Sequence, residues 1–299
     1  MKILIFGGSG QVGFELQRAL APVAEVVAPG SGGLPRIDVT DFSTLEKVVA
    51  SAGPDVVINA SAYTAVDKAE TERDLATKIN AEAPGVLARA SAKRGAVMVH
   101  YSTDYVFAGN GDTPHRESDA TGPLNHYGAS KLAGEEAVAR GNANNLVLRT
   151  SWVYAAHGKN FPKTILRLAK ERDSLNIVAD QFGAPTGAPL LADATTQALL
   201  KLQAGAKAWG LYHLVAGGET SWHELAVFLC REAVAQGFLS KAPEIKPIPT
   251  HDFPTPAKRP FNSRLDTAKF RSTFNLHLPD WKDGIAHLVR ELALAKLLA

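Results

Sequence analysis

Hydrophobic residues along the first half of the chain form short runs, and amphipathic stretches separate one run from the next. The runs indicate strands and the stretches indicate helices, because a helix buries only one face. Since the runs lack strict alternation, we expect the strands to be buried on both faces of a parallel sheet. The predicted strands are residues 2–6, 25–28, 55–60, 96–102 and 145–149, and the predicted helices are residues 15–20, 44–50, 80–93 and 130–140.

After Thr150 the alternation becomes irregular. The segment 242–260 contains six prolines and is predicted to be a loop, either ordered or flexible. The pattern as a whole predicts an α/β fold, with a Rossmann-type doubly wound parallel sheet and a smaller C-terminal domain. In this second part, helices are predicted at residues 161–171, 191–202, 221–235 and 281–298, and strands at residues 176–178 and 211–215.

The composition adds limits to this picture. A chain of 299 residues is long enough for about two domains. Its net charge of +2 gives no strong attraction to nucleic acid or to a membrane surface, and no apolar stretch approaches the ~18 residues of a membrane span. The single cysteine, Cys230, fits a reducing compartment, so the cytoplasm is the expected location.

Three glycines, Gly7, Gly10 and Gly13, follow the first predicted strand at the point where a helix begins. Glycine permits a tight turn and a close approach of phosphate to the backbone. The N-terminus of the helix adds free N–H groups and positive potential. The motif therefore predicts a dinucleotide site, and a glycine-rich turn without a ligand is the alternative. Its G-x-x-G-x-x-G spacing resembles that of the short-chain dehydrogenases.

Residues 24–35 lack the acidic residue that commonly binds the ribose 2′-hydroxyl of NAD at the end of the second strand. Because an acid there would repel a 2′-phosphate, the sequence favours NADP (NADPH) over NAD (NADH), and the nearest arginine is Arg36. Asp38 and Val39 match a pair that contacts adenine in short-chain dehydrogenases, although Asp38 also suits a helix cap. Residues 59–62, Asn-Ala-Ser-Ala, resemble the N-A-A-A sequence that passes beneath the cofactor.

Tyr127 and Lys131 form a Y-x-x-x-K motif, whose two members share one face of a helix. We expect the Lys131 ammonium to lower the pKa of Tyr127 and make it a usable acid. Thr103 and Asp104 follow the fourth strand, where doubly wound sheets bind ligands. The Thr103 hydroxyl is suited to polarise a carbonyl, with Ser102 as the competing choice.

These motifs resemble those of the dTDP-4-dehydrorhamnose reductases, a family of extended short-chain dehydrogenases. The family reduces the 4-keto group of a dTDP-linked 6-deoxyhexulose to dTDP-L-rhamnose, the last step of dTDP-rhamnose biosynthesis. The resemblance therefore implies an NAD(P)H-dependent reductase with a dTDP-sugar substrate. It runs along essentially the whole chain, in the stretches GQVGFELQRALAP, NASAYTAVDKAE, HYSTDYVFAGNGD, PLNHYGASKLAGE, RTSWVYAAHGKNF, DQFGAPTGAPLLAD, GLYHLVAGG and NSRLDTAKF.

The resemblance also implies a role for each matching position. Tyr127 is expected to donate the proton, Lys131 to bind the nicotinamide ribose, and Thr103 to bind the sugar carbonyl. Asp104, Trp152 and Asn262 are expected to contact the substrate, and Arg264 its diphosphate unless it forms a surface salt bridge. The cofactor is expected to contact Gly7, Gly10, Gln11, Val12, Gly13, Asp38, Val39, Ala60, Ala62, Tyr63 and Thr64 as well as Tyr127 and Lys131.

We expect residues 1–151 and about 186–215 to form the cofactor-binding domain, and residues about 152–185 and 216–299 the substrate domain. Pro189 stands where some family members carry an acid that helps to hold a divalent ion between subunits. Although Glu15 remains, we expect no metal, and a homodimer stays open. His100 is expected to be a hydrogen-bonded core residue, and Trp222 a packing residue.

Two other functions remain open at this stage. One is another nucleotide-sugar reductase or an epimerase of the same fold. A dehydratase is disfavoured, because it would need an acidic pair where Asp104 is followed by Tyr105. The other is a non-catalytic NADP-binding regulatory subunit, which the intact Tyr127 and Lys131 disfavour.

Overall fold

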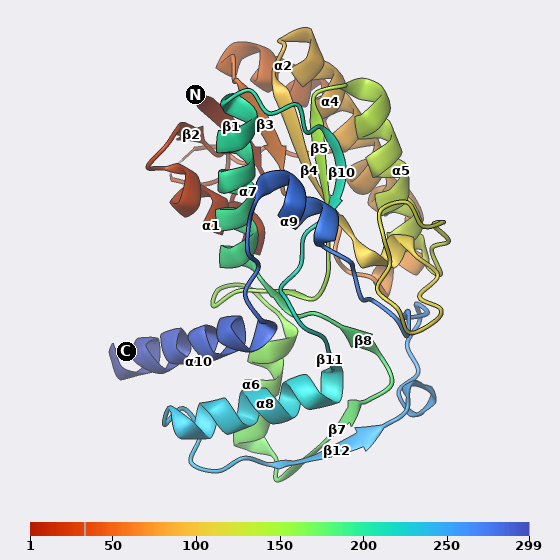
Figure 1. The fold of residues 1–299 in the computed structure, drawn as a ribbon, viewed down its shortest axis with the longest axis vertical. Coiled ribbons are helices and arrows are strands. Elements are labelled where there is room, and N and C mark those ends of the chain that lie inside the picture. The colour runs from red at the N-terminus through yellow and green to blue at the C-terminus, as the bar shows by residue number, and fades with distance from the viewer. Residues whose placement is uncertain (33, 299) are drawn as a thin grey trace.

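The computed structural model describes residues 1–32 and 34–298. Residue 33, in the segment that lacks the ribose-binding acid, lies outside the described residues, as does residue 299 at the end of the expected substrate domain. Figure 1 shows a sheet flanked by helices above and a smaller group of helices and short strands below. Within the described part of the chain, no helix is long and apolar enough to cross a membrane.

The main sheet has six parallel strands in the order β10-β5-β4-β3-β1-β2. Chain order therefore reverses at β1, because β2 lies on one side of it and β3 on the other. Ligands of doubly wound sheets bind at such a reversal, beside the carboxyl ends of the strands. The strands are β1 (Lys2–Phe6), β2 (Glu25–Val27), β3 (Val56–Asn59), β4 (Val97–Thr103), β5 (Asn145–Thr150) and β10 (Gly210–His213).

Helices cover both faces of this sheet (Figure 1). One face packs its apolar side chains against α1 (Gln11–Leu20), α7 (Ala188–Gln203) and α9 (Ala268–Phe274). The opposite face packs against α2 (Phe42–Ala52), α4 (Ala83–Lys93) and α5 (His126–Gly141). Burial on both faces explains the continuous apolar strands, and the predicted Rossmann-type fold is confirmed.

A separate apolar core lies below the sheet, where Leu166, Leu229 and Ile285 are buried. They come from α6 (Phe161–Glu171), α8 (Trp222–Ala235) and α10 (Trp281–Leu298). Short strand pairs join these helices: β7 (Ser174–Val178) with β12 (Glu244–Ile248), β6 (Val153–Tyr154) with β9 (Thr186–Gly187), and β8 (Phe182–Gly183) with β11 (Thr220–Ser221).

Several elements differ from the prediction. The proline-rich segment 242–260 is ordered in part, since β12 pairs along its whole length with β7. Strand β12 contains Pro247, which an edge strand tolerates. Helix α5 begins at His126, four residues earlier than predicted, because the Asn125 side chain accepts a hydrogen bond from the Gly128 N–H and caps it. Short elements were missed: η1 (Lys68–Glu70), α3 (Arg73–Thr77), the π-helix η2 (Lys78–Glu82), η3 (Asp104–Val106), η4 (Thr250–Asp252) and α9.

Candidate active site

The glycine turn follows β1 and lies against the residues that follow β3, and it leaves no room for side chains. Gly7 has φ +86°, and a Cβ on it would lie 2.5 Å from the Ser61 backbone nitrogen. A Cβ on Gly13 would lie 2.2 Å from the Gly7 carbonyl oxygen. Helix α1 starts at Gln11, and its N-cap residue Gly10 provides no side-chain cap, so the first N–H groups of the helix remain available to a phosphate.

Other residues expected at the cofactor have partners within the protein. The Gln11 side-chain oxygen accepts a hydrogen bond from Asn160 Nδ2 at 2.8 Å, and Val12 packs against the sheet. Asp38 is exposed, and hydrogen bonds from Thr40 lower its pKa. The cap of α2 is Asp41, so the alternative interpretation of Asp38 as that cap is wrong. Val39 packs against the opposite face of the sheet.

A residue that the sequence analysis missed holds the loop after β3. Asn80 is fully buried, its Oδ1 accepts from the Tyr63 N–H at 2.8 Å, and its Nδ2 donates to the Ser130 hydroxyl at 3.0 Å. It therefore ties α5 to the loop that contains Ala60, Ala62, Tyr63 and Thr64. Asn80 lies in the π-helix η2, a local feature that no sequence pattern indicated.

Two glycines on α5 allow the helix to pass close to its neighbours. A Cβ on Gly128 would lie 2.2 Å from the Tyr105 carbonyl oxygen, and one on Gly134 would lie 2.1 Å from the Asn80 carbonyl oxygen. The close approach brings the Y-x-x-x-K face of α5 against the end of β4.

Tyr127 lies in the first turn of α5, with its ring edge-on to Tyr105 at 5.7 Å between centroids. Desolvation raises the pKa of Tyr127, the negative charge of Asp104 adds to the rise, and a hydrogen bond with Thr103 opposes it. The expectation that Lys131 lowers this pKa is therefore wrong for this structure. The reason is that Lys131 Nζ is hydrogen-bonded to the Tyr101 carbonyl oxygen.

Lys131 is 2% exposed, and its Nζ donates to the Tyr101 carbonyl oxygen at 2.6 Å. Its other neighbour is His100 Nε2 at 3.4 Å. Burial lowers the pKa of Lys131 to about 8, although Glu135 acts in the opposite direction. His100 is fully buried and hydrogen-bonded to Asn59, so its expected place in the core is confirmed.

Thr103 and Asp104 are both buried at the end of β4. The Thr103 hydroxyl donates to Asp104 Oδ1 at 2.9 Å, while Asp104 Oδ2 has no partner. Burial raises the pKa of Asp104 to about 6, against hydrogen bonds from Ser263 and Thr103. The competing choice was Ser102. Its hydroxyl donates to Glu135 Oε1 at 2.5 Å, so it is already engaged by a residue other than Tyr127.

A cleft of about 370 Å³ begins beside Tyr105 and extends to Trp222. Trp222 stacks on Trp152 with 3.5 Å between ring centroids, and its Nε1 donates to Gln181. Trp152 has φ +49°, an uncommon conformation for a bulky residue. Trp222 thus packs, as expected, and it also lines the cleft.

The side chains of Asn262 and Arg264 both have partners within the protein. Asn262 is buried and donates to the Thr113 carbonyl oxygen at 2.8 Å. Arg264 pairs with Glu219 at 2.7 Å, which is the salt bridge that we gave as the alternative to a diphosphate contact. The arginine that lines the cleft is Arg259, which pairs with Asp67 at 2.7 Å. Its position between two prolines in the segment 242–260 concealed it from sequence analysis.

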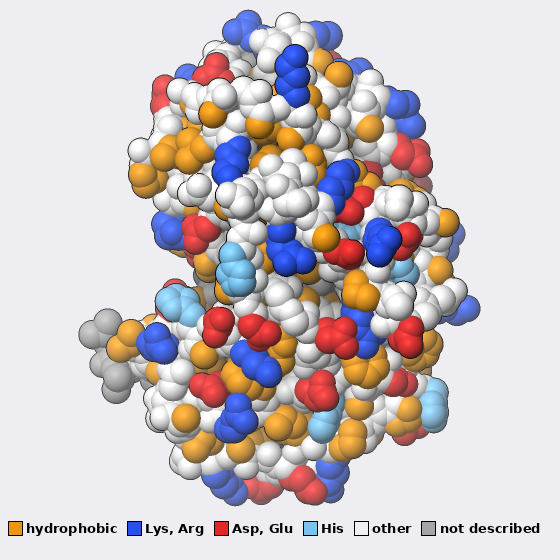
Figure 2. All heavy atoms as spheres, viewed as in Figure 1, with side chains coloured by type: hydrophobic (Ala, Val, Ile, Leu, Met, Phe, Trp, Pro, Cys, Tyr) orange, Lys and Arg blue, Asp and Glu red, His pale blue; other side chains and the backbone are white. Residues whose placement is uncertain are grey.

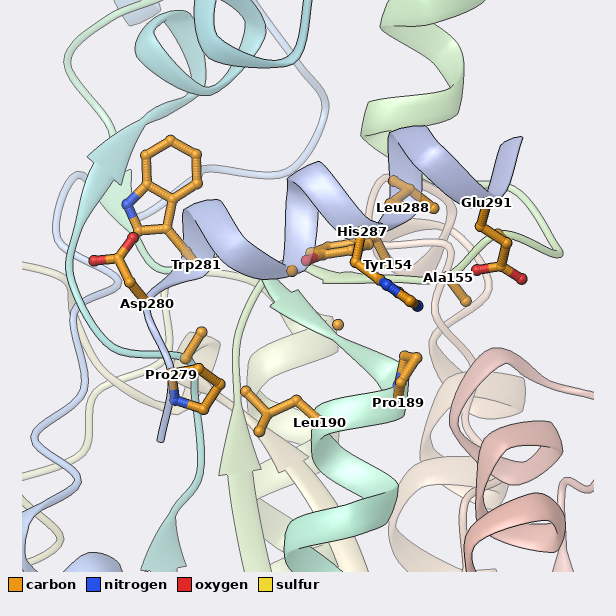
Figure 3. A pocket seen from close by; sticks show the side chains of 14 residues that line it. Tyr154, Ala155, Pro189, Leu190, Pro279, Asp280, Trp281, His287, Leu288 and Glu291 are labelled. Carbon is orange, nitrogen blue, oxygen red and sulfur yellow. The ribbon is translucent and has the colours of Figure 1, made fainter. Parts of the chain in front are cut away.

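A second cavity lies between α10 and the first turn of α7, and Tyr127 does not line it (Figure 3). Its lining is mostly apolar and includes Tyr154, Pro189 and His287. Glu15, the acid noted together with Pro189, forms an ion pair with Arg18 at 2.8 Å. Over residues 1–32 and 34–298, no group of three or more His, Cys, Asp and Glu side chains is arranged to hold a metal ion.

The surface charge is mixed. Figure 2 shows Lys and Arg side chains interspersed with Asp and Glu over the face that carries α8 and α9. This arrangement fits the net charge of +2.

Comparisons with known proteins agree with this geometry. The family model described as the RmlD substrate binding domain matches residues 1–294. A dTDP-4-dehydrorhamnose reductase of Shigella flexneri is 51% identical, over 98% of each chain. A solved dTDP-4-dehydrorhamnose reductase of Clostridium acetobutylicum is 37% identical, with a TM-score of 0.86 and all of both chains covered.

A third relative bears on the cofactor. The dTDP-4-dehydrorhamnose reductase of Bacillus anthracis, solved in complex with NADP, is 34% identical with a TM-score of 0.86, over 97% of this chain and 100% of that one. A Thermus thermophilus UDP-glucose 4-epimerase at 21% identity shares the fold alone. The match of the family model over nearly the whole chain, together with these identities, shows that the chain belongs to the dTDP-4-dehydrorhamnose reductase family.

Proposed function

We propose that this protein reduces the 4-keto group of dTDP-4-dehydro-6-deoxy-L-mannose (dTDP-4-dehydrorhamnose) to dTDP-L-rhamnose with NADPH, and with NADH as a second cofactor. Two observations carry the proposal: Tyr127, Thr103 and Asp104 lie together at the end of β4, and the glycine turn after β1 leads into a helix without a side-chain cap. A proton donor and a phosphate-binding turn at the switch point of a doubly wound sheet suit a dinucleotide-dependent reductase.

The residues of the glycine turn fit a dinucleotide. Gly10, Gln11 and Val12 would line its pyrophosphate, with the N–H groups of Gln11 and Val12 as donors, because no side-chain cap occupies them and no Cβ fits at Gly7 or Gly13. The Gly10 N–H already donates to the Gly7 carbonyl oxygen at 2.9 Å. Asp38 and Val39 would contact the adenine, and Ala60, Ala62, Tyr63 and Thr64 would flank the cofactor. When bound, the nicotinamide supplies a hydride for the sugar carbon.

Arg36 supports the preference for NADPH. A Cβ on Gly30 would lie 2.9 Å from Arg36 Cγ, so Arg36 lies against the turn that follows β2. Its exposed guanidinium is suited to a 2′-phosphate, which guanidinium groups bind in bidentate fashion. We expect Arg36→Ala to raise the KM for NADPH about 10-fold and to leave the KM for NADH unchanged.

Tyr127 would give its proton to the carbonyl oxygen of the sugar. Because desolvation raises its pKa, the phenol stays protonated at neutral pH, as a proton donor in the reductive direction requires. Thr103 would orient the carbonyl, and Lys131 would bind the nicotinamide ribose. Asp104, whose pKa is about 6, is mostly ionised at neutral pH and would accept hydrogen bonds from sugar hydroxyls.

The cleft beside Tyr105 would hold the dTDP-sugar, since its volume lies in the range of small-molecule sites. Trp152 would contact the sugar, and Arg259 would bind the diphosphate, with Arg264 and Asn262 supporting the loop. On this basis residues 1–151 and about 186–215 bind the cofactor, and residues about 152–185 and 216–299 bind the substrate. The two separate apolar cores support this division except at α9, whose Phe270 and Phe274 pack in the core of the main sheet.

The test is NADPH oxidation in the presence of dTDP-4-dehydro-6-deoxy-L-mannose, with the product identified by NMR. Tyr127→Phe should lower kcat by about 10²–10⁴-fold and leave the Kd for NADPH unchanged. NADPH binding without oxidation of any dTDP-hexulose would favour a regulatory subunit, and a product epimerised without net reduction would favour an epimerase.

The location and the oligomeric state belong to the same proposal. A lone buried thiol at Cys230 supports a cytoplasmic location. We propose a homodimer that does not depend on a metal bridge, to be measured by light scattering with and without a chelator.

A further inference from the structure

A chain of polar side chains leads from Lys131 into the sheet, through His100 and Asn59 to Ser61. His100 and Asn59 are 0% exposed and Lys131 is 2% exposed, so bulk water does not supply their hydrogen-bond partners. Buried polar groups need partners of the opposite kind, donor to acceptor. The donors and acceptors along this chain can therefore be assigned one after another.

The orientation of the Asn59 amide is set by the backbone. Asn59 Oδ1 lies 3.1 Å from the backbone nitrogen of Ser61, and the Ser61 hydroxyl donates to the same oxygen. Because a backbone N–H is only a donor, the atom that faces it must be the amide oxygen. Asn59 Nδ2 then faces His100 Nδ1 at 3.2 Å. Since Nδ2 is only a donor, His100 Nδ1 must accept, and a neutral imidazole that accepts at Nδ1 carries its hydrogen on Nε2.

This tautomer directs a donor at Lys131. His100 Nε2 lies 3.4 Å from Lys131 Nζ, and Lys131 Nζ donates to the Tyr101 carbonyl oxygen at 2.6 Å. An ammonium has three donors and no lone pair, so it would oppose the Nε2–H of His100. A neutral amine, by contrast, donates to the carbonyl and accepts from the imidazole.

Burial lowers the pKa of Lys131 and the charge of Glu135 raises it. The titratable groups that face Lys131 are Glu135, one turn further along α5, and His100 on β4. Both oxygens of Glu135 are already occupied by Arg149 on β5, at 2.9 and 2.7 Å. Because this carboxylate is shared with a guanidinium, Lys131 has no counter-charge of its own. Burial lowers the pKa of His100 well below its usual range, which keeps the imidazole neutral.

We propose that Asn59 and His100 are positioning residues that hold the imidazole as its Nε2–H tautomer and thereby favour the neutral amine of Lys131 in the cofactor-free protein. The inference deepens the proposed function, because Lys131 is the residue proposed to bind the nicotinamide ribose. It implies that, near and above the pH at which Lys131 titrates, the residue takes up a proton when the anionic cofactor binds.

The test is NMR of the cofactor-free protein labelled with ¹⁵N-histidine and ¹³C,¹⁵N-lysine. Two-bond correlations report the tautomer of His100, and the Cε shift of Lys131 reports its protonation. His100→Gln and Lys131→Met identify the two signals. We expect the Nε2–H tautomer and a Lys131 titration near pH 8, where its pKa lies. An Nδ1–H tautomer, or a Lys131 that keeps its proton to about pH 10 like an ordinary lysine, would overturn the proposal.

Asn59→Asp reverses the assignment. A carboxylate only accepts, so it takes hydrogen bonds from the Ser61 N–H and from a His100 Nδ1–H, and the Nε2 lone pair then faces Lys131. We expect the tautomer to switch and the Lys131 titration to rise by ~1 pH unit or more. The double variant Asn59→Asp/His100→Phe keeps the added negative charge but has no imidazole. It should therefore lose most of the rise in the pH at which Lys131 titrates. Ser61→Ala is the matched control, because it keeps the backbone N–H and should keep the tautomer.

An Asn59→Asp protein that folds and still shows the Nε2–H tautomer would contradict the proposal. If that variant does not fold, the wild-type and Ser61→Ala spectra decide the matter. The spectra are recorded without cofactor or substrate. A protein that reduces no dTDP-sugar can therefore still satisfy this test, and an active reductase can fail it.

Discussion

On the sheet side of the candidate site, polar side chains are buried and bonded to one another, whereas on the cleft side they are accessible and pair across a cavity. Glu135, Arg149 and Ser102 illustrate the first arrangement, with side chains at most 8% exposed in the ion pair. Arg259 and Asp67 illustrate the second, with side chains 20% and 40% exposed. Buried networks are costly to disturb, while accessible pairs exchange partners easily. The sheet side is thus suited to hold reacting groups still, and the cleft side to release its groups to a substrate.

The largest expected effect is on the sheet side. Glu135→Gln removes the carboxylate and leaves the Arg149 guanidinium buried without a counter-charge. We expect the free energy of unfolding to fall by about 3–5 kcal/mol, as measured by urea denaturation. Glu171→Gln is the control, because the Arg167–Glu171 pair is exposed and its loss should have no measurable effect. Equal effects of the two variants would remove the contrast between the regions.

Next in size is the pH dependence that Asp104 contributes. Burial raises its pKa from 3.8 to about 6, so the folded protein binds this proton more tightly than the unfolded chain. The resulting stability is fully present below pH 3.8 and is lost as the pH rises through about 6. At about 1.4 kcal/mol per pH unit, the contribution falls by on the order of 2–3 kcal/mol over this window.

In the Asp104→Asn variant, the side chain has no carboxyl group that could bind this proton. The difference in unfolding free energy between wild type and variant should therefore change by that amount when urea unfolding is measured at about pH 4.5 and about pH 7. A difference that does not vary with pH would show that Asp104 is solvated like an ordinary surface carboxylate.

A smaller loss is expected from Gly134→Ala, which tests the close approach of α5. The new Cβ would lie 2.1 Å from the Asn80 carbonyl oxygen. Helix propensity favours alanine by about 1 kcal/mol, but overpacking costs about 1–3 kcal/mol. We expect a net loss of stability and a weaker Kd for NADPH, because Asn80 holds the Tyr63 backbone. Gly122→Ala is the matched control, with its nearest atom at 3.5 Å, and should leave NADPH binding unchanged.

The smallest effect is expected on the cleft side. Trp222→Leu removes the stack with Trp152, which is worth about 0.5–1.5 kcal/mol, so the KM for the dTDP-sugar should rise about 2- to 12-fold. The KM for NADPH should not change. Trp209→Leu is the control, because Trp209 lines a cavity beside Met1, away from the cleft. A change in NADPH affinity of Trp222→Leu would mean that the two regions are coupled.

Sequence patterns predicted local features well and assigned some neighbours wrongly. The apolar runs predicted where the strands of the main sheet lie along the chain, because burial on both faces leaves a continuous signature. The expected effect of Lys131 on Tyr127 was wrong, since sharing a helix face does not fix where a long side chain points. Arg259, which lines the cleft, was not singled out, because the route of the proline-rich segment depends on its pairing with β7.

By itself, the sequence determined the doubly wound fold, the glycine turn and the Tyr127–Lys131 motif, all of which rest on short-range spacing. Only the tertiary structure decided the hydrogen-bond partners of Lys131, the role of Asn80 and the arginine that lines the cleft. Those contacts join residues far apart in the chain, and burial then sets their protonation. Spacing along the chain gives no information on these contacts or on these protonation states. Both depend on which groups are buried together, away from water.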